Sequence, residues 1–218
     1  MIWGIYLAAG RSRRMGKPKL CLPVGGRPLG GIALEAAAAS QLNGITVVTQ
    51  AEDSLEWIPA FMFDNPYRRG WDHVACEASH AGMSESIKVG LLHAQSLQAQ
   101  AVVILLADQP FVTAQLIDHI INMYKNGNKA FIAAGHNGIP RPPVLFDSCM
   151  FPDLFRLQGD DGARRIIRDN GGKKGITANW HDGKCFIDID TQNDYESLLC
   201  EETVRWKTTA SFPRRILR

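Results

Sequence analysis

Short apolar runs alternate with longer segments of helical character along most of the chain. This alternation is typical of βαβ units around a mostly parallel sheet. The runs that predict strands are Ile2–Leu7, Ile45–Thr49, Phe61–Asp64, Ala101–Ala107 and Ala130–Ala134. The segments that predict helices are Pro28–Leu42, Ser84–Leu97, Ala114–Tyr124, Gly162–Asp169 and Asn193–Leu199. We therefore expect an α/β fold with a mostly parallel central sheet and helices on both faces.

The run "AVVILLAD", residues 101–108, is apolar without alternation, as in a strand that helices cover on both faces. It is the expected centre of the sheet. In such sheets, ligands bind at the carboxyl ends of the strands, near the point where the strand order reverses. Three polar motifs occupy positions of this kind: the loop after Leu7, "DQP" after the central run, and "DIDT" at 188–191. We expect them to converge on one site.

Composition narrows the class of protein. The 218 residues, 45% of them hydrophobic, suit a single domain, expected over 1–200, followed by a basic tail at 201–218. A net charge of only +2 argues against general nucleic-acid binding, and no apolar run is long enough to span a membrane. Five cysteines without a C-x-x-C pair suit a reducing compartment, so we expect a cytoplasmic protein.

The opening loop "LAAGRSRRMGKPKL" carries most of the local positive charge. It is not a P-loop, because five residues separate Gly10 from Gly16 and Pro18 follows Lys17. It also lacks the second glycine of a dinucleotide-binding fingerprint. Its terminal glycines still allow backbone N–H groups to approach an anion, and its cations could clamp a triphosphate. On charge alone, a solvated basic turn or a nucleic-acid-binding patch is an equal alternative.

The same loop resembles the L-x-x-G-x-S-x-R-M-G-x-x-K signature of nucleotidyltransferases that act on molybdenum cofactor, the MobA/MocA type, and of related nucleotide-sugar pyrophosphorylases. Five further motifs follow in the family's order: "GMSESIKVGL", "LLADQPFV", "PPVLF", "GDDGARRI" and "DIDTQNDY". "LAAG", "DQP" and "GDDGAR" together look closest to the cytidylyltransferase branch. The resemblance implies a Rossmann-like nucleotide-diphospho-sugar transferase fold. It also implies Mg²⁺-dependent transfer of a nucleoside monophosphate, first of all CMP from CTP, to the phosphate of a molybdopterin-type cofactor.

The resemblance also implies roles for individual residues. The positions that match the nucleotide-binding motifs are Leu7, Ala8, Ala9, Gly10, Arg11, Ser12, Arg13, Lys19, Gly82, Ser84 and Asp108. The expected catalytic residues are Arg14, Lys19 and Asp108, and the expected Mg²⁺ ligands are Asp108 and Asp190. The expected acceptor-binding residues are Gln109, Pro110, Gly159, Asp161 and Arg164.

The residues themselves support part of this assignment. A carboxylate at a strand tip such as Asp108 suits Mg²⁺, and a role in a turn or as a helix cap is the lesser alternative. Asp188 and Asp190 would share a face of an extended segment. Thr191 could cap the following helix, with Asp194 at its third position.

Ser84 also reads as an N-cap, and the "GMSES" and "GDDGAR" motifs could both be no more than helix starts.

The segment Pro66–Ala81 departs from the family pattern, because it is about ten residues longer than the resemblance leads us to expect. We expect it to be loop-like. His73, Cys76, Glu77 and His80 are spaced for one helical face, which could bind Zn²⁺, although an exposed polar insertion is the more ordinary interpretation. An ordered insertion here would lie beside the base pocket.

Other functions stay open at this point. A nucleotidyltransferase of sugar phosphates or isoprenoid precursors would share the opening loop. An accessory protein could instead carry molybdopterin to a molybdenum hydroxylase such as xanthine dehydrogenase without catalysis. The presence of both Asp108 and Asp190 favours an enzyme over such a carrier.

Overall fold

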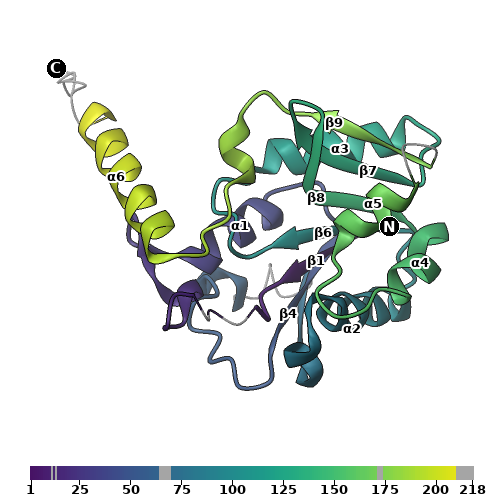
Figure 1. Ribbon diagram of the computed structural model, residues 1–218, viewed down its shortest axis with the longest axis horizontal. Helices are drawn as coiled ribbons and strands as arrows, with labels where there is room; N and C mark the ends of the chain where they lie inside the picture. Colours follow the sequence, from purple (N-terminus) through teal and green to yellow (C-terminus); the bar gives the residue numbers. More distant parts are fainter. Residues whose placement is uncertain (11, 13, 64–69, 171–173, 210–218) are drawn as a thin grey trace, which may run out of the picture.

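The computed structural model describes residues 1–10, 12, 14–63, 70–170 and 174–209. A seven-stranded sheet with the order β5-β4-β1-β6-β8-β7-β9 forms its centre (Figure 1). Its strands are β1 (Ile2–Leu7), β4 (Gly44–Gln50), β5 (Trp71–Cys76), β6 (Ala101–Leu106), β7 (Phe131–His136), β8 (Ile139–Asp147) and β9 (Gly175–Asn179). A separate small hairpin pairs β2 (Pro23–Val24) with β3 (Arg27–Pro28).

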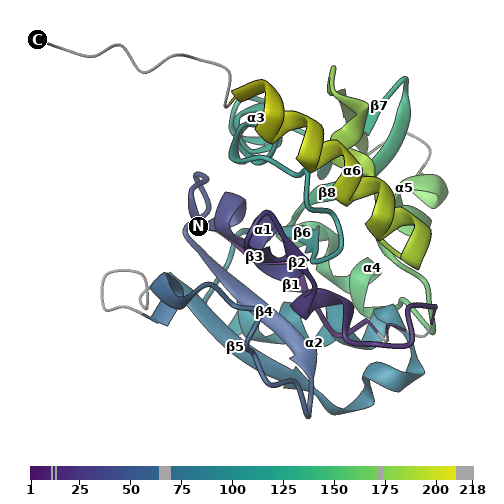
Figure 2. The same ribbon diagram turned by 90° about the vertical axis from the view of Figure 1, so that its left-hand side faces the viewer.

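The sheet is mostly parallel, as the sequence predicted. Only β8 runs against its neighbours β6 and β7, and the other adjacent strands pair in parallel. Strand β6, the continuous apolar run, is fourth of the seven, which confirms it as the centre. Figure 2 shows β4 and β5 together at one side of the sheet, with β7 and β8 toward the other.

Helices cover both faces. The α-helices are α1 (Leu29–Ala38), α2 (Met83–Ser96), α3 (Ala114–Lys125), α4 (Phe151–Phe155), α5 (Ala163–Asn170) and α6 (Gln192–Thr209). Helices α1 and α3 bury their apolar faces in one core, whereas α2, α4 and α5 contribute to a second core on the opposite face. The two-sided cover explains why the central strands carry apolar residues at every position.

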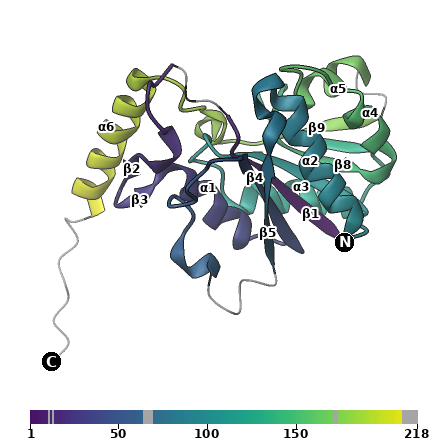
Figure 3. The same cartoon turned by 90° about the horizontal axis from the view of Figure 1, so that it is seen from below.

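Helix α6 stands apart from the two faces and packs beside the β2–β3 hairpin (Figure 3). Tyr195 fastens it there, since its hydroxyl donates a 2.6 Å hydrogen bond to the carbonyl of Pro23. Tyr195 and Leu198 join a small third core with Val24 and Met15. The helix runs past residue 200, where the sequence placed the end of the domain, and the division between domain and tail stays a prediction.

The expected strand Phe61–Asp64 is wrong. Residues Ala60–Phe63 form a 3₁₀ turn instead, in which the amide of Met62 donates to the carbonyl of Pro59; Asp64 lies outside the described residues. An apolar run of four residues has no periodicity that separates a strand from a buried helical turn. The strand of this region, β5, lies later, inside the segment expected to be loop.

Strands β8 and β9 were not predicted. The turn between β7 and β8 is formed by Asn137 and Gly138, with φ values of 51° and 77°. Asn-Gly with two positive φ values is the signature of a two-residue hairpin turn. The dipeptide therefore held the signal for this hairpin.

Candidate functional site

Three segments far apart in the sequence meet at the ammonium group of Lys19. Its Nζ donates to Asp108 Oδ2 at 2.8 Å, to Asp190 Oδ1 at 2.9 Å and to the carbonyl of Ile189 at 3.0 Å. The residue is only 7% exposed. The opening loop, "DQP" and "DIDT" thus form one cluster, as the sequence predicted.

The sheet register brings these segments together. Leu7 and Leu106 pair at the carboxyl ends of β1 and β6, and the amide of Ala107 donates to the carbonyl of Leu7 at 3.1 Å. The chain order turns back at this point, since β4 lies on one side of β1 and β6 on the other. The carbonyl of Asp108 then accepts from the amide of Ile189 at 2.9 Å, which holds the "DIDT" segment against the strand end.

Lys19 and the carboxylates of Asp108 and Asp190 stabilise one another's charges. Burial alone would lower the pKa of Lys19, but the charges and hydrogen bonds of Asp108 and Asp190 more than offset it, so the pKa is raised and the ammonium stays charged. Burial, together with the nearby Asp108 and Asp190, raises the pKa of Asp188, against the opposing effect of the hydrogen bond from Gln109. Gln109 Nε2 donates to Asp188 Oδ1 at 2.8 Å.

The pair of carboxylates fits a divalent cation. Asp108 and Asp190 already share one cationic group, the Lys19 ammonium, so their oxygens face a common point. Mg²⁺ commonly takes one or two carboxylates and completes its coordination with water and substrate phosphates. No group of three or more metal-ligating side chains occurs within the part of the chain that the structure describes. Two carboxylates therefore suit a metal that arrives with a phosphate substrate.

Ser12 organises the opening loop. Its Oγ accepts from the amide of Lys19 at 3.1 Å, and its carbonyl accepts from the amides of Met15 and Gly16. Gly16 has a φ of 65°, a conformation that glycine tolerates best. These bonds fold the loop back so that Arg14 Nη2 reaches Asp190 Oδ2 at 2.8 Å. Arg11 and Arg13, two of the expected nucleotide-binding residues, lie outside the described residues.

The segment that carries Asp190 is fixed by a helix cap. The hydroxyl of Thr191 accepts from the amide of Asp194 at 3.2 Å, while Asp194 Oδ2 accepts from the amides of Thr191 and Asp190. This reciprocal capping arrangement confirms the cap expected from the sequence. It positions the Asp190 carboxylate at the start of α6.

A hollow of about 500 Å³ opens on one side of the cluster and is called the first hollow here. Its wall includes seven expected nucleotide-binding residues and the expected catalytic Arg14: Leu7, Ala9, Gly10, Ser12, Arg14, Lys19, Gly82 and Asp108. Ala8 and Ser84 are buried behind this wall and do not line it. The expected Mg²⁺ ligand Asp190 and His80 of the Pro66–Ala81 segment also line it. The other lining residues had no expected role in this site: Ser79, Met83, Ser86, Leu106 and Asp160.

Gly82 lines the first hollow and brings the start of α2 against the backbone of Gly159. It has a φ of 125°, and a Cβ at this position would lie 2.2 Å from the carbonyl of Gly159. The amide of Ser84 donates to the same carbonyl at 3.0 Å. The N-cap of α2 is Gly82, so the interpretation of Ser84 as a capping side chain is wrong. Ser84 is instead fully buried as the second residue of the helix, and its Oγ has no hydrogen-bond partner among the described residues.

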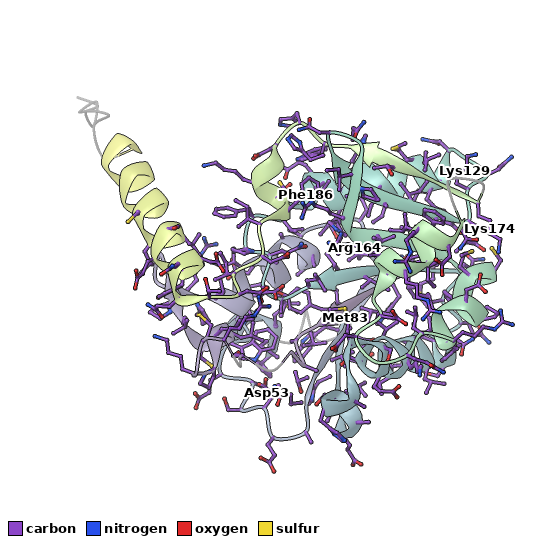
Figure 4. All side chains as sticks on the ribbon, viewed as in Figure 1. Asp53, Met83, Lys129, Arg164, Lys174 and Phe186 are labelled. Carbon is purple, nitrogen blue, oxygen red and sulfur yellow. The ribbon has the colours of Figure 1, made fainter. Side chains whose placement is uncertain are left out.

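The expected acceptor-binding residues lie around the cluster but line neither this hollow nor the next. Gln109 is 2% exposed and holds Asp188, while Pro110 lines a separate groove beside α1 and α3. Asp161 pairs with Arg165 on α5. Arg164 is exposed, and in Figure 4 it lies, in projection, between Met83 and Phe186.

A second hollow, of about 630 Å³, opens on the other side and shares Arg14 and Asp190 with the first. The turn of the β7–β8 hairpin, the 3₁₀ turn Gly183–Phe186 and the segment before α6 form its wall. Its remaining lining residues are His136, Asn137, Ile139, Arg141, Gly183, Phe186, Ile187, Asp188, Thr191 and Asp194. Of these, only Asp188, Thr191 and Asp194 were expected near the site from the sequence, because the β7–β8 hairpin was not predicted.

The segment Pro66–Ala81 is ordered where the structure describes it, from residue 70 onward, so the expectation of a loop is wrong there. His73 and Cys76 belong to β5, and Glu77 and His80 to the 3₁₀ turn Glu77–Ala81. Strand residues three apart point to opposite faces, so the four side chains do not share a helical face. His73 instead bonds with Thr49 Oγ1 at 2.8 Å. Ser79 and His80 line the first hollow, which places this segment beside the expected base pocket.

None of the helices in the described ranges combines the length and apolar character needed to cross a membrane.

Comparison with known proteins agrees with this geometry. The chain is 36% identical over 194 residues to the purine catabolism protein PucB of Bacillus subtilis (strain 168). The aligned region covers 88% of this chain and 93% of PucB. The crystal structure of Rv0371c from Mycobacterium tuberculosis H37Rv is similar, with 26% identity, a TM-score of 0.73 and coverage of 91% of this chain and 97% of that one.

A structure of Rv0371c in complex with manganese is similar too, with 25% identity, a TM-score of 0.70 and the same coverage of both chains. The sequence model of the MobA-like NTP transferase domain matches residues 4–175, which is most of the chain. The converging strand ends, the basic loop and the paired carboxylates thus sit in a fold of the expected kind, and the chain belongs to the family of MobA-like NTP transferase domains.

Proposed function

We propose that this nucleotidyltransferase transfers CMP from CTP to the phosphate of a molybdopterin-type cofactor, with release of pyrophosphate. The observation that carries the proposal is the convergence of Lys19, Asp108 and Asp190 between two hollows. Two hollows that share one wall of charged groups suit a reaction between two phosphate-bearing substrates. The "LAAG", "DQP" and "GDDGAR" motifs support the cytidylyltransferase assignment.

The residues of the chain supply positioning and charge. Gly10 and Ser12 place backbone groups along the first hollow, and Arg14 and Lys19 would stabilise negative charge on the triphosphate. Asp108 and Asp190 would hold Mg²⁺, which when bound neutralises phosphate charge and orients the reacting oxygens.

An oxygen of the acceptor phosphate forms the new bond to the α-phosphorus while the bond to the β-phosphate bridging oxygen breaks. This nucleophile is largely ionised at neutral pH, so no general base is required. The individual roles of the expected nucleotide- and acceptor-binding residues remain part of the proposal.

The similarity to PucB supports the choice of recipient. Its name places that relative in purine catabolism. A purine-oxidising molybdenum hydroxylase such as xanthine dehydrogenase would be a fitting recipient of the finished cofactor, and we place the reaction in the cytoplasm.

Release of pyrophosphate tests the proposal directly. Purified protein is incubated with Mg²⁺ and molybdopterin, with CTP, GTP, ATP or UTP in turn, and Asp108→Asn serves as the inactive control. We expect acceptor-dependent release that is fastest with CTP. A preference for GTP or ATP would overturn the cytidylyl assignment but keep the reaction class.

No release with any nucleotide, from protein that still binds molybdopterin, would indicate a carrier. Faster release with a sugar phosphate or an isoprenoid phosphate in place of molybdopterin would overturn the acceptor assignment.

A further inference from the structure

The second hollow has exposed apolar walls next to charged groups. Six large hydrophobic residues are exposed among the described residues: Met1, Phe63, Met83, Leu92, Ile139 and Ile187. Two of them, Ile139 at 56% and Ile187 at 40%, line the second hollow together with Phe186. Apolar side chains left exposed around a concave surface are typical of a site that covers a ligand.

Arg141 gives the same hollow an available cation. Its side chain is partly buried at the start of β8, and its guanidinium forms no hydrogen bond or ion pair with any residue that the structure describes. Arg14, at the wall shared with the first hollow, is by contrast paired with Asp190. Arg141 does act on Asp188 through its charge, which lowers the pKa of that carboxyl, but its guanidinium N–H groups are not used by any hydrogen bond to a described residue. Such a guanidinium is suited to bind a phosphate in two-pronged geometry.

The acidic residues of the hollow are already occupied. Asp190 accepts from Lys19 and Arg14, and Asp188 accepts from Gln109. Asp194 is used by the cap of α6. None of these carboxylates forms a direct ion pair with Arg141, although the charge of Arg141 lowers the pKa of Asp188, so an incoming anion would not have to break a direct contact to reach it.

A tight turn and a hydrogen bond hold the backbone around Arg141 in place. The Asn137–Gly138 turn closes the hairpin, and His136 Nδ1 donates to the carbonyl of Trp180 at 2.9 Å. With Nδ1 committed to Trp180, Nε2 is the ring nitrogen left to interact with a ligand. The ring also packs against Gly183, where a Cβ would lie 3.0 Å from it. A flat ligand with polar ring atoms would therefore meet both an imidazole nitrogen and apolar walls.

From these features we infer that the second hollow binds the acceptor, with Arg141 holding its phosphate and Ile139 and Ile187 packing against its ring. The ligand class is a planar heteroaromatic body that carries a phosphate, and the inference rests on the proposed function for the identity of that ligand as molybdopterin. It moves the acceptor from the predicted Gly159–Arg164 segment to the β7–β8 hairpin. The shared Arg14 and Asp190 would place the acceptor phosphate beside the nucleotide in the first hollow.

Equilibrium binding of molybdopterin, measured by isothermal titration calorimetry, tests the inference without requiring turnover. We expect Arg141→Gln to weaken this binding at least about tenfold, since a charge-assisted contact is lost. The affinity for CTP should stay within about twofold of the wild type, because Arg141 lies outside the first hollow. Arg156→Gln, which changes an arginine that is 79% exposed at the C-terminal end of α4, is the matched control and should change neither value.

A second pair of variants tests the apolar wall. Ile139→Asn should weaken molybdopterin binding about threefold to tenfold while leaving CTP binding unchanged. Leu92→Asn, at an equally exposed apolar position on α2, should have no effect on either ligand. Thermal unfolding of all variants shows whether each is folded, and because Ile139 and Arg141 act independently, one misfolded variant leaves the other as the test.

The outcomes separate the two proposals. Unchanged molybdopterin affinity in both Arg141→Gln and Ile139→Asn, or a loss confined to Arg164→Gln, overturns the assignment of the second hollow. Loss of binding in Arg141→Gln, with a wild type that binds molybdopterin but transfers no CMP, supports the hollow and overturns the proposed function. A wild type that does not bind molybdopterin at all overturns both.

Discussion

The two hollows on either side of the Arg14–Asp190 pair are built from different kinds of structure. The first follows the end of β1 and the start of α2, and small residues such as Ala9, Gly10 and Gly82 expose backbone in its wall. The second is lined largely by the side chains of a hairpin and an extended segment, with Ile139, Arg141 and Ile187 among them.

This difference has a physical consequence. Backbone groups at tight glycine positions suit phosphates, which are the same in every nucleotide, and such positions tolerate little change. Side chains on a hairpin can be exchanged without altering the backbone that carries them. We therefore expect substitutions in the first hollow to disturb the fold and nucleotide binding together, and substitutions in the second to alter ligand choice alone.

The largest effect on activity should come from Asp108, which lines the first hollow beside the shared Arg14–Asp190 pair. Asp108→Asn removes one of the two carboxylate charges around Lys19, and we expect kcat to fall by about a thousandfold or more. The amide can still accept from Lys19, so stability should fall by only about 1–2 kcal/mol. Kinetics and thermal unfolding measure the two quantities, and near-normal turnover would contradict the role of Asp108.

Arg14→Gln should separate activity from stability. Its side chain is 67% exposed, so its ion pair with Asp190 contributes at most about 1 kcal/mol to folding. Because Arg14 lines both hollows, we expect kcat/KM to fall about a hundredfold for both substrates. An effect on one substrate alone would show that the wall is not shared.

Two glycines with positive φ compare the walls directly. Gly82→Ala places a Cβ 2.2 Å from the backbone of Gly159, so we expect a loss of about 2–4 kcal/mol in the free energy of unfolding and weaker CTP binding. Gly138→Ala meets nothing within 4 Å and should cost only about 1 kcal/mol through its φ of 77°. Chemical denaturation of both variants measures the difference, and equal losses would show that the two walls tolerate change alike.

The smallest effect on function should come from Tyr124, which contacts Asp147 at the C-terminal end of β8, away from both hollows. Partial burial alone would raise the pKa of Asp147, but hydrogen bonds from Tyr124 and Cys149 lower it overall. A lowered pKa contributes stability that is present above the unfolded value of 3.8 and is lost as pH falls through the folded value. Tyr124→Phe should therefore cost about 1 kcal/mol near neutral pH and less in acid, with both KM values unchanged.

Urea unfolding of the wild type and of Tyr124→Phe near pH 7 and near pH 3 gives the free energies of unfolding that test this prediction. A loss of similar size at both pH values would mean that Tyr124 stabilises the protein through packing rather than through Asp147. A changed KM for the acceptor would show that the far end of β8 is coupled to the second hollow.

Part of the fold follows from local patterns. Strands β1 and β6 are buried on both faces, so their apolar runs are long and continuous, and Gly10 and Asp108, a few residues after these runs, mark the strand ends. The caps and loops at these ends use short-range bonds, such as those of Thr191 with Asp194. Such features are encoded within a few residues, and the cluster of Lys19, Asp108 and Asp190 could be predicted from them and from the family resemblance.

Other parts depend on contacts between distant segments. The apolar run at Phe61 forms a turn because it packs beneath α1, and residues 71–76 form a strand because β4 offers them a free edge. The second hollow joins Arg14 to residues more than a hundred positions later, and no single motif spans it. The sequence by itself determined the central strands and the charged cluster, where local pattern and burial agree. Only the tertiary structure decided the edge strand, the reversed β8 and the second hollow, because their residues gain a partner only when the sheet has formed.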